Sequence, residues 1–183
     1  NLILQSAVQD IGIKRIITSK IEHHATLHTI QHLEKTNNIE SVYIDILHTG
    51  MIDYLHLAKL LHEEKHTLVS LMHVNNEIGT ILDIERVGKL CIAASALFHC
   101  DTVQSIGKID LNLHELPIDF AVATAHKFHG PKGIGFLYMS SDVKLKPMIT
   151  GGAQERNMRA GTENIYGIAG LAKALELAYD DVE

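Results

Sequence analysis

The feature of the sequence that most constrains its fold is an alternation between short apolar runs and longer amphipathic stretches. The apolar runs have the length of β-strands and occupy residues 15–19, 41–46, 67–74, 96–101, 119–125 and 133–139. Helical periodicity appears between several of them, at residues 25–36, 53–64 and 84–96. Such alternation predicts an α/β domain whose mostly parallel sheet has helices on both faces. No repeat or proline-rich linker interrupts residues 1–183, so we expect one domain.

Polar side chains follow four of the apolar runs. His23 comes after the first run, Asn76 after the third, Asp101 closes the fourth, and Lys127 follows the fifth. Ligands of parallel α/β sheets bind at the carboxyl ends of the strands. The sequence therefore predicts one crevice into which these four strand ends converge.

Charge and hydropathy exclude several classes of partner. The formal charge is -6 and lysines and arginines form no run, which argues against nucleic acid or an anionic membrane as a partner. No apolar run approaches the roughly 18 residues of a membrane span, and the first residues lack the pattern of a signal peptide. These features predict a cytoplasmic protein. The chain starts without methionine in an apolar helical pattern and ends in a long helical run, so we expect a piece of a larger protein.

The two cysteines predict no disulfide framework. Cys91 and Cys100 are not part of a C-x-x-C pair, and each lies in an apolar surrounding. Buried, unreactive thiols are the favoured interpretation.

One stretch fits a metalloprotease motif. "HEEKH", from His62 to His66, has the H-E-x-x-H spacing in which two histidines bind zinc and a glutamate activates water. Its two middle residues are Glu64 and Lys65, and it lies where a predicted helix gives way to a strand. A solvated turn is therefore the favoured interpretation. We expect no ligand spacing among the remaining histidines, and no metal site.

Lys127 and Asp101 are the residues that first indicate a cofactor. A lysine at a strand end suits a Schiff base, which needs a partly desolvated amine that can lose its proton. A buried aspartate suits pyridoxal phosphate (PLP), whose ring nitrogen must stay protonated to store carbanion electrons. Lysines and aspartates at strand ends are common, so the pair alone is weak evidence for a PLP site.

Whole strings of sequence add a family resemblance. "SKIEHHATLHT", "MHVNNEIGT", "CDTVQSIGKI", "TAHKFHGPKGIGFLY" and "GGAQERNMRAGTEN" occur in the same order as in cysteine desulfurases, and the resemblance covers essentially the whole chain. These are PLP enzymes of the class V aminotransferase group with fold type I, and "RAGTEN" resembles their iron-sulfur or nitrogenase branch. The resemblance implies a three-layer large domain, conversion of L-cysteine to L-alanine with an enzyme-bound persulfide, a homodimer, and a sulfur-acceptor or scaffold protein as partner.

The resemblance also implies catalytic roles. Lys127 would form the Schiff base and move the proton of the substrate α-carbon, and His23 would stack on the PLP ring and exchange protons with substrate. Asp101 would pair with the pyridine nitrogen. Gln104 and Asn76 would face the phenolic oxygen of the ring or the substrate.

A second set of residues is implied for the phosphate. Thr124 and His126 would hold it within one subunit, and Thr162 would reach a phosphate across a dimer interface. Each is chemically suited, because hydroxyl and imidazole N–H groups donate to phosphate. Thr162 is also an obvious N-cap for a helix over residues 163–179, and both interpretations stay open.

The chain departs from the family pattern at few positions. Thr124 stands where many relatives carry serine, and Ala153 and Asn157 replace glycines. The family's phosphate-binding glycine- or alanine-threonine turn should precede Asn1. The loop with the catalytic cysteine, the arginine that binds the substrate carboxylate and the small C-terminal domain should follow Glu183. We therefore expect a large domain that lacks part of the site and is inactive alone.

Other interpretations remain for the whole and for single residues. The protein could be another class V lyase or aminotransferase, such as one like selenocysteine lyase, or a non-catalytic scaffold that kept the fold. Asn75 could simply brace a turn, and His24 could be a surface residue. Gly130 and Gly133 could serve a tight turn rather than the cofactor.

Overall fold

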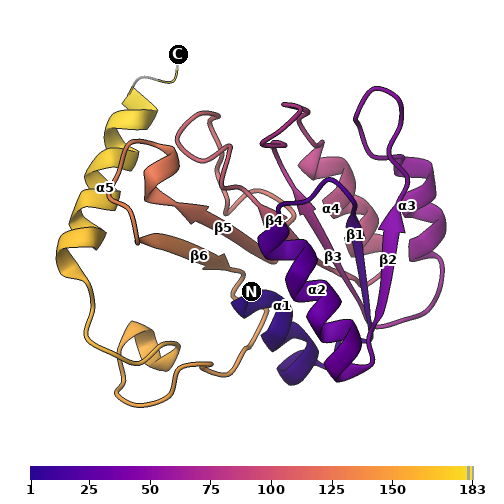
Figure 1. Ribbon diagram of the computed structural model, residues 1–183, viewed down its shortest axis with the longest axis horizontal. Helices are drawn as coiled ribbons and strands as arrows, with labels where there is room; N and C mark the ends of the chain where they lie inside the picture. Colours follow the sequence, from indigo (N-terminus) through magenta and orange to yellow (C-terminus); the bar gives the residue numbers. More distant parts are fainter. Residues whose placement is uncertain (181, 183) are drawn as a thin grey trace.

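A six-stranded sheet forms the centre of the computed structural model, which describes residues 1–180 and residue 182 (Figure 1). The strands are β1 (Arg15–Ser19), β2 (Glu40–Ile44), β3 (Thr67–Met72), β4 (Leu97–Asp101), β5 (Phe120–Thr124) and β6 (Gly135–Met139). Their order is β2-β1-β3-β4-β5-β6. The first five strands run parallel, and β6 pairs antiparallel with β5. The six predicted strands and the mostly parallel sheet are confirmed.

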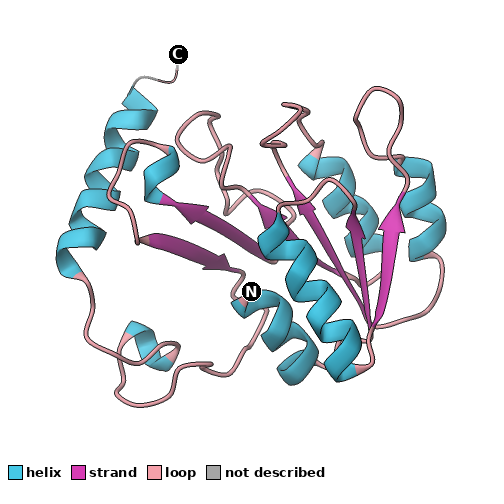
Figure 2. Ribbon diagram, viewed as in Figure 1, coloured by secondary structure: helices cyan, strands magenta, loops and turns pink. Residues whose placement is uncertain are grey.

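Helices cover both faces of the sheet, as predicted (Figure 2). On one face lie α1 (Leu2–Ser6), the π-helical turn η1 (Ala7–Ile11) and α2 (His24–Asn37). On the other face lie α3 (Tyr54–Leu61) and α4 (Ile84–Ala93). Short 3-10 turns η2 (Ala125–Lys127) and η3 (Glu155–Asn157) follow, and α5 (Ile165–Asp180) packs beside η2.

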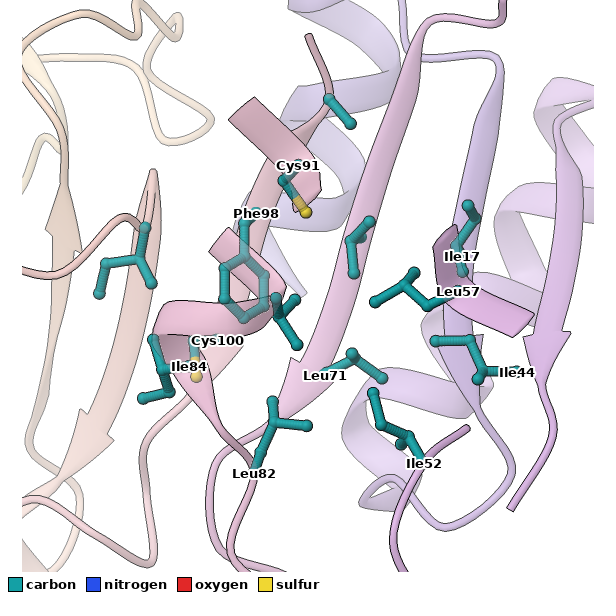
Figure 3. Close-up of a cluster of buried hydrophobic side chains, with 14 of the residues drawn as sticks. Ile17, Ile44, Ile52, Leu57, Leu71, Leu82, Ile84, Cys91, Phe98 and Cys100 are labelled. Carbon is teal, nitrogen blue, oxygen red and sulfur yellow. The ribbon is translucent and has the colours of Figure 1, made fainter. Parts of the chain in front are cut away.

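The two faces of the sheet belong to two separate apolar clusters because side chains alternate along each strand. Ile16 of β1 packs in the cluster with α1 and α2, whereas its neighbour Ile17 packs in the cluster with α3 and α4 (Figure 3). Cys91 and Cys100 belong to the second cluster, and both are free and buried. Burial raises the pKa of Cys91 to about 12 and that of Cys100 well above its ordinary value. Both thiols therefore stay protonated and unreactive.

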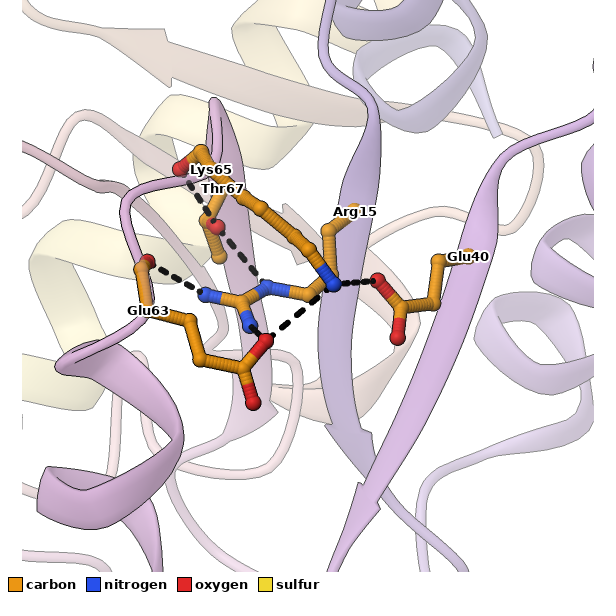
Figure 4. Close-up of polar contacts among 5 residues, drawn as sticks. All are labelled: Arg15, Glu40, Glu63, Lys65 and Thr67. Carbon is orange, nitrogen blue, oxygen red and sulfur yellow. Dashed lines mark hydrogen bonds and ion pairs between the residues drawn. The ribbon is translucent and has the colours of Figure 1, made fainter.

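A polar network ties three strands together at their amino ends (Figure 4). Arg15 is only 1% exposed; its Nε donates to Thr67 Oγ1 at 3.0 Å and its Nη1 donates to Glu63 Oε2 at 2.9 Å. Lys65 Nζ lies 3.1 Å from Glu63 Oε2 and 2.7 Å from Glu40 Oε2. The network thus joins β1, β2 and the chain entering β3.

Among the residues that the structure describes, no helix combines the length and the apolar character needed to cross a membrane.

Candidate active site

The carboxyl ends of the parallel strands open into a cavity of about 590 Å³. In the sheet, β2 lies on one side of β1, whereas β3 and the later strands lie on the other side. The strand order therefore changes direction between β1 and β3, and α/β sheets bind ligands at the carboxyl ends of the strands at such a point. The cavity is lined by seven of the eight side chains that the sequence singles out: His23, Asn76, Asp101, Gln104, Thr124, His126 and Lys127. Four loops, separated along the chain, thus bring their polar residues to one place.

His23 is held in place by the start of α2. It is the N-cap residue of that helix, and its Nδ1 accepts a hydrogen bond from the backbone N–H of Ala25 at 3.1 Å. Because Nδ1 is the acceptor, the hydrogen of the neutral ring lies on Nε2. The free edge of the ring therefore presents a donor toward the cavity that His23 lines.

The turn before His23 rests on two buried polar residues. Ser19 Oγ donates to Glu22 Oε1 at 2.7 Å. Asn75 Nδ2 donates to the carbonyl of Ile21 at 2.7 Å, and its Oδ1 accepts from the N–H of Glu77 and of Ile78. Asn75 therefore braces its own turn, which is one of the interpretations that the sequence allows. It also connects the loop after β3 to the loop after β1.

Glu22 is a buried carboxyl that the sequence did not single out. It is 6% exposed, and its Oε2 has no hydrogen-bond partner among the described residues. Burial, with a further contribution from the nearby charge of Asp101, raises the pKa of Glu22 to about 8, although the hydrogen bond from Ser19 opposes the shift. Glu22 thus holds a proton at neutral pH.

Asp101 closes β4 and lies almost fully inside the protein. Its Oδ1 accepts a hydrogen bond from the N–H of Val103 at 3.0 Å. Burial raises its pKa, while the Val103 hydrogen bond and the nearby His23 act in the opposite direction. A carboxylate here gains most from a cationic hydrogen-bond donor, because such a partner offsets the cost of burying the charge.

His99 lines the cavity and was not singled out by the sequence. It lies two residues before Asp101 on β4, so both side chains are on the same side of the sheet. Its Nδ1 is 2.9 Å from Ser70 Oγ. Burial lowers the pKa of His99 to about 3, so the ring stays neutral and adds no charge beside Asp101.

The end of β5 and the turn after it also line the cavity, through Thr124, His126 and Lys127. Thr124 Oγ1 lies 3.0 Å from His126 Nδ1 and 3.3 Å from the carbonyl of Ile134. The hydroxyl has one hydrogen: when it donates to Nδ1, the hydrogen of the neutral imidazole is on Nε2 and His126 is the donor, and when it turns to another acceptor, Thr124 is the donor. Lys127 ends the 3-10 turn and is half-buried among these groups.

The glycines after Lys127 serve the turn. Gly133 has φ +81°, which favours glycine, and a Cβ on Gly130 would lie 2.8 Å from the Cβ of Ala125. Neither glycine lines the cavity that holds Lys127. The tight-turn interpretation accounts for both.

Thr162 lies apart from the other predicted site residues. It lines a different cavity, together with neighbours that include Gly161 and Glu163. The prediction that it caps the following helix is wrong, since α5 begins at Ile165 and Asn164 Oδ1 accepts from the N–H of Gly167 at 3.1 Å. Asn164 is thus the capping residue.

The zinc motif "HEEKH" does not lie on a helix. α3 ends at Leu61, and the motif forms the turn that follows. Glu63, which would have to activate water, instead pairs with Arg15 and Lys65. The favoured interpretation, a solvated turn, fits the exposed placement of residues 62–66.

Comparison with known proteins decides the family. Residues 1–183 match the class-V aminotransferase family over their whole length. The chain belongs to this family. It is 47% identical over 165 residues to the cysteine desulfurase IscS of Dictyoglomus turgidum, which covers 90% of this chain and 41% of that protein. The chain thus spans about two fifths of the length of that class-V relative.

Two solved structures agree with this assignment. One described as a NifS-like protein superposes with a TM-score of 0.92 at 40% identity, over 98% of this chain and 50% of the other. A second, of SspA in complex with cysteine, gives a TM-score of 0.90 at 33% identity over 96% of this chain and 51% of the other. The fold is therefore that of the NifS-like class-V enzymes.

The class-V family is PLP-dependent, and the residues in the cavity suit that cofactor. Asp101 is a buried carboxyl at the cavity wall, Lys127 is a half-buried amine, and Thr124 with His126 forms a hydrogen-bonded pair of possible phosphate donors. A basic ring nitrogen, an aldehyde and a phosphate would each meet a group of matching chemistry.

Proposed function

We propose that this chain is the PLP-binding large domain of a cysteine desulfurase, which converts L-cysteine to L-alanine and retains the sulfur as a persulfide. The observation that carries the proposal is the cavity shared by His23, Asp101 and Lys127 in a chain 47% identical to an IscS desulfurase. PLP, when bound, supplies an electron sink for the bond broken at the substrate α-carbon.

Asp101 would hold the proton on the pyridine nitrogen. Burial raises its pKa, and a cationic ring N–H beside it would favour the carboxylate. Because His99 stays neutral beside it, Asp101 would be the anionic partner of that ring nitrogen.

Lys127 and His23 would handle the protons of the substrate. Lys127 is the amine that would attach to the cofactor and, once displaced by the substrate amine, would take the proton from the α-carbon. His23, with its hydrogen on Nε2, would cover the ring and donate to the substrate. Both residues come from loops fastened to strand ends, which limits their motion.

The remaining predicted residues would position the cofactor. Thr124 and His126 would hold the phosphate, and Asn76 and Gln104 would face the phenolic oxygen or the substrate. Thr162 lines a separate cavity in this chain, so we propose that it serves the phosphate of a second copy in a homodimer.

Substrate and partners belong to the same proposal. The SspA relative is described as a complex with cysteine, which supports cysteine as the substrate. Cys91 and Cys100 are buried and cannot carry a transferable sulfur. The sulfur-carrying thiol would therefore come from the catalytic loop of a longer cytoplasmic protein, and the sulfur would pass to an acceptor or scaffold protein.

Covalent labelling tests the cofactor role of Lys127. The full-length protein is incubated with PLP, reduced with borohydride, digested and analysed by mass spectrometry. We expect the label on Lys127 and none in Lys127→Ala, while Lys132→Ala, which removes an exposed lysine outside the cavity, keeps it. A label elsewhere, or none on a folded protein, contradicts the proposed site.

Product analysis then separates the possible reactions. With L-cysteine, a desulfurase forms alanine and a persulfide in equal amounts. Transamination products, or alanine from selenocysteine alone, would favour another class V enzyme. Labelling of Lys127 without any product would favour a scaffold that kept the fold.

A further inference from the structure

Helix α2 carries three histidines at four-residue intervals: His24, His28 and His32. All three are exposed. Residues four apart lie on the same face of an α-helix, one turn above the other. The prediction that the histidines outside "HEEKH" lack ligand spacing is therefore wrong.

His24 and His28 are paired in space as well as in spacing. Their ring centroids are 4.9 Å apart and the ring planes differ by only 8°, so the two rings stack face to face on the exposed side of the helix. Both side chains are exposed, and a change of side-chain rotamer would turn one nitrogen of each ring toward a shared ion. We propose that these two imidazoles bind a divalent transition-metal ion such as Cu²⁺ or Zn²⁺, a site outside the cavity described above.

The chemistry of the pair suits such an ion. Neutral imidazole is a good ligand for Cu²⁺, Ni²⁺ and Zn²⁺, and Cu²⁺ binds most tightly to a given set of nitrogen ligands. Two histidines one helical turn apart on one face are also the arrangement in the helix of zinc proteases. No group of three or more potential ligands is gathered among the described residues, so water would complete the coordination.

The turn at "HEEKH" provides an internal contrast. His62 and His66 have the same four-residue spacing, but α3 ends at Leu61, so no helix holds these two rings on one face. His24 and His28 both lie inside the 14-residue helix α2. The two pairs share the four-residue spacing, but only His24 and His28 are held on one face of a helix.

The position of the pair connects it to the cavity. His24 directly follows His23, which lines the cavity and caps α2. An ion held by His24 and His28 would fasten the first turn of the helix, and with it the cap that orients the His23 ring. The site itself uses no cavity residue, so it does not depend on the proposed desulfurase function.

Titration with Cu²⁺ tests the site. Binding to the purified protein is followed by calorimetry, and the number of coordinated nitrogens is read from the electron paramagnetic resonance spectrum. We expect one ion with two imidazole ligands in the wild type. His24→Gln or His28→Gln should weaken binding on the order of 10²-fold, because the second ligand no longer acts at high effective concentration.

Two variants serve as controls. His32→Gln, on the same helix face, and the double variant His62→Gln/His66→Gln should bind as the wild type does. Loss of binding in His32→Gln with retention in His24→Gln would assign the ion to the other pair and overturn the proposal. Unchanged binding in His24→Gln and His28→Gln, or a wild type without saturable binding, would also overturn it. Circular dichroism of each variant checks that α2 is intact.

Discussion

Glu22 is a residue whose titration should be visible in the stability of the protein. Its pKa is about 8 in the folded protein against an ordinary value of 4.5, since burial penalises the charge. At a pH between these two pKa values, the carboxyl of Glu22 is ionised in the unfolded chain and protonated in the folded chain. Stability from this residue is therefore greatest below the unfolded pKa and falls as pH rises toward 8.

Glu22→Gln should remove this dependence. We expect the free energy of unfolding of the variant, relative to the wild type, to rise with pH by up to about 1.4 kcal/mol per unit across this interval. Urea unfolding of both proteins between about pH 5 and pH 8 measures the difference. The exposed Glu115→Gln serves as control and should parallel the wild type. A Glu22→Gln profile parallel to the wild type would show that Glu22 is already ionised.

At the residue scale, the predicted convergence of strand-end side chains on one crevice agrees with the structure, while their roles stay predictions. His23, Asp101 and Lys127 stood out because each follows a strand, and the structure brings them to one cavity. Glu22 and His99 did not stand out, because only the packing of several elements buries them. Local sequence does not show which carboxyl or imidazole will lose its water.

At the scale of elements, helix α4 packs too closely against the loop before β5 to accept a larger residue. A Cβ on Gly88 would lie 2.3 Å from the carbonyl oxygen and 2.4 Å from the Cγ of Pro117. Gly88→Ala should therefore destabilise the protein by about 1 to 3 kcal/mol, through overpacking. Chemical denaturation measures the loss. Lys89→Ala, on the exposed side of α4, should have little effect, and equal effects of the two variants would contradict the packing argument.

The ends of the elements were less predictable than their existence. α3 ends at Leu61 rather than Glu64, because Glu63 leaves the helix to reach Arg15. α4 ends at Ala93 rather than Ala96, since Ser95 takes up a left-handed conformation with φ 52°. Both endings depend on tertiary contacts or on a backbone conformation that helical periodicity does not reveal.

The strand directions were predictable only in part. Alternation with helices predicted the parallel strands. β5 and β6 are connected by a 3-10 turn and a glycine turn, without a crossover helix. Such a short connection joins antiparallel strands, because parallel strands need a longer crossover, and β6 pairs antiparallel with β5. The pairing of the six strands into the order β2-β1-β3-β4-β5-β6 came from the structure alone.

At the scale of the whole molecule, the amino ends of the strands stabilise the fold and the carboxyl ends form the cavity. Arg15 lies at the amino ends of the strands, opposite the cavity, and is 1% exposed. Arg15→Ala should lower the free energy of unfolding by about 2 to 4 kcal/mol, because it removes a large buried side chain and its hydrogen bonds. The affinity of the full-length protein for PLP should not change.

Urea unfolding and a PLP titration of the same preparation test this separation. Lys14→Ala, which removes the exposed neighbouring charge, is the matched control and should change neither quantity. A loss of PLP affinity in folded Arg15→Ala protein would show that the two ends of the sheet are coupled.

The strand order also has a consequence for synthesis of the chain. β1 pairs with β2 on one side and with β3 on the other, and the register places Arg15 beside Thr67. As the chain leaves the ribosome, β1 and β2 can pair early, but one edge of β1 stays open until β3 emerges. From β4 onward each new strand joins the edge that the preceding strand has just formed. The sheet can therefore form in the order of translation, and at each stage the edge of the most recently added strand stays unpaired until the next strand emerges.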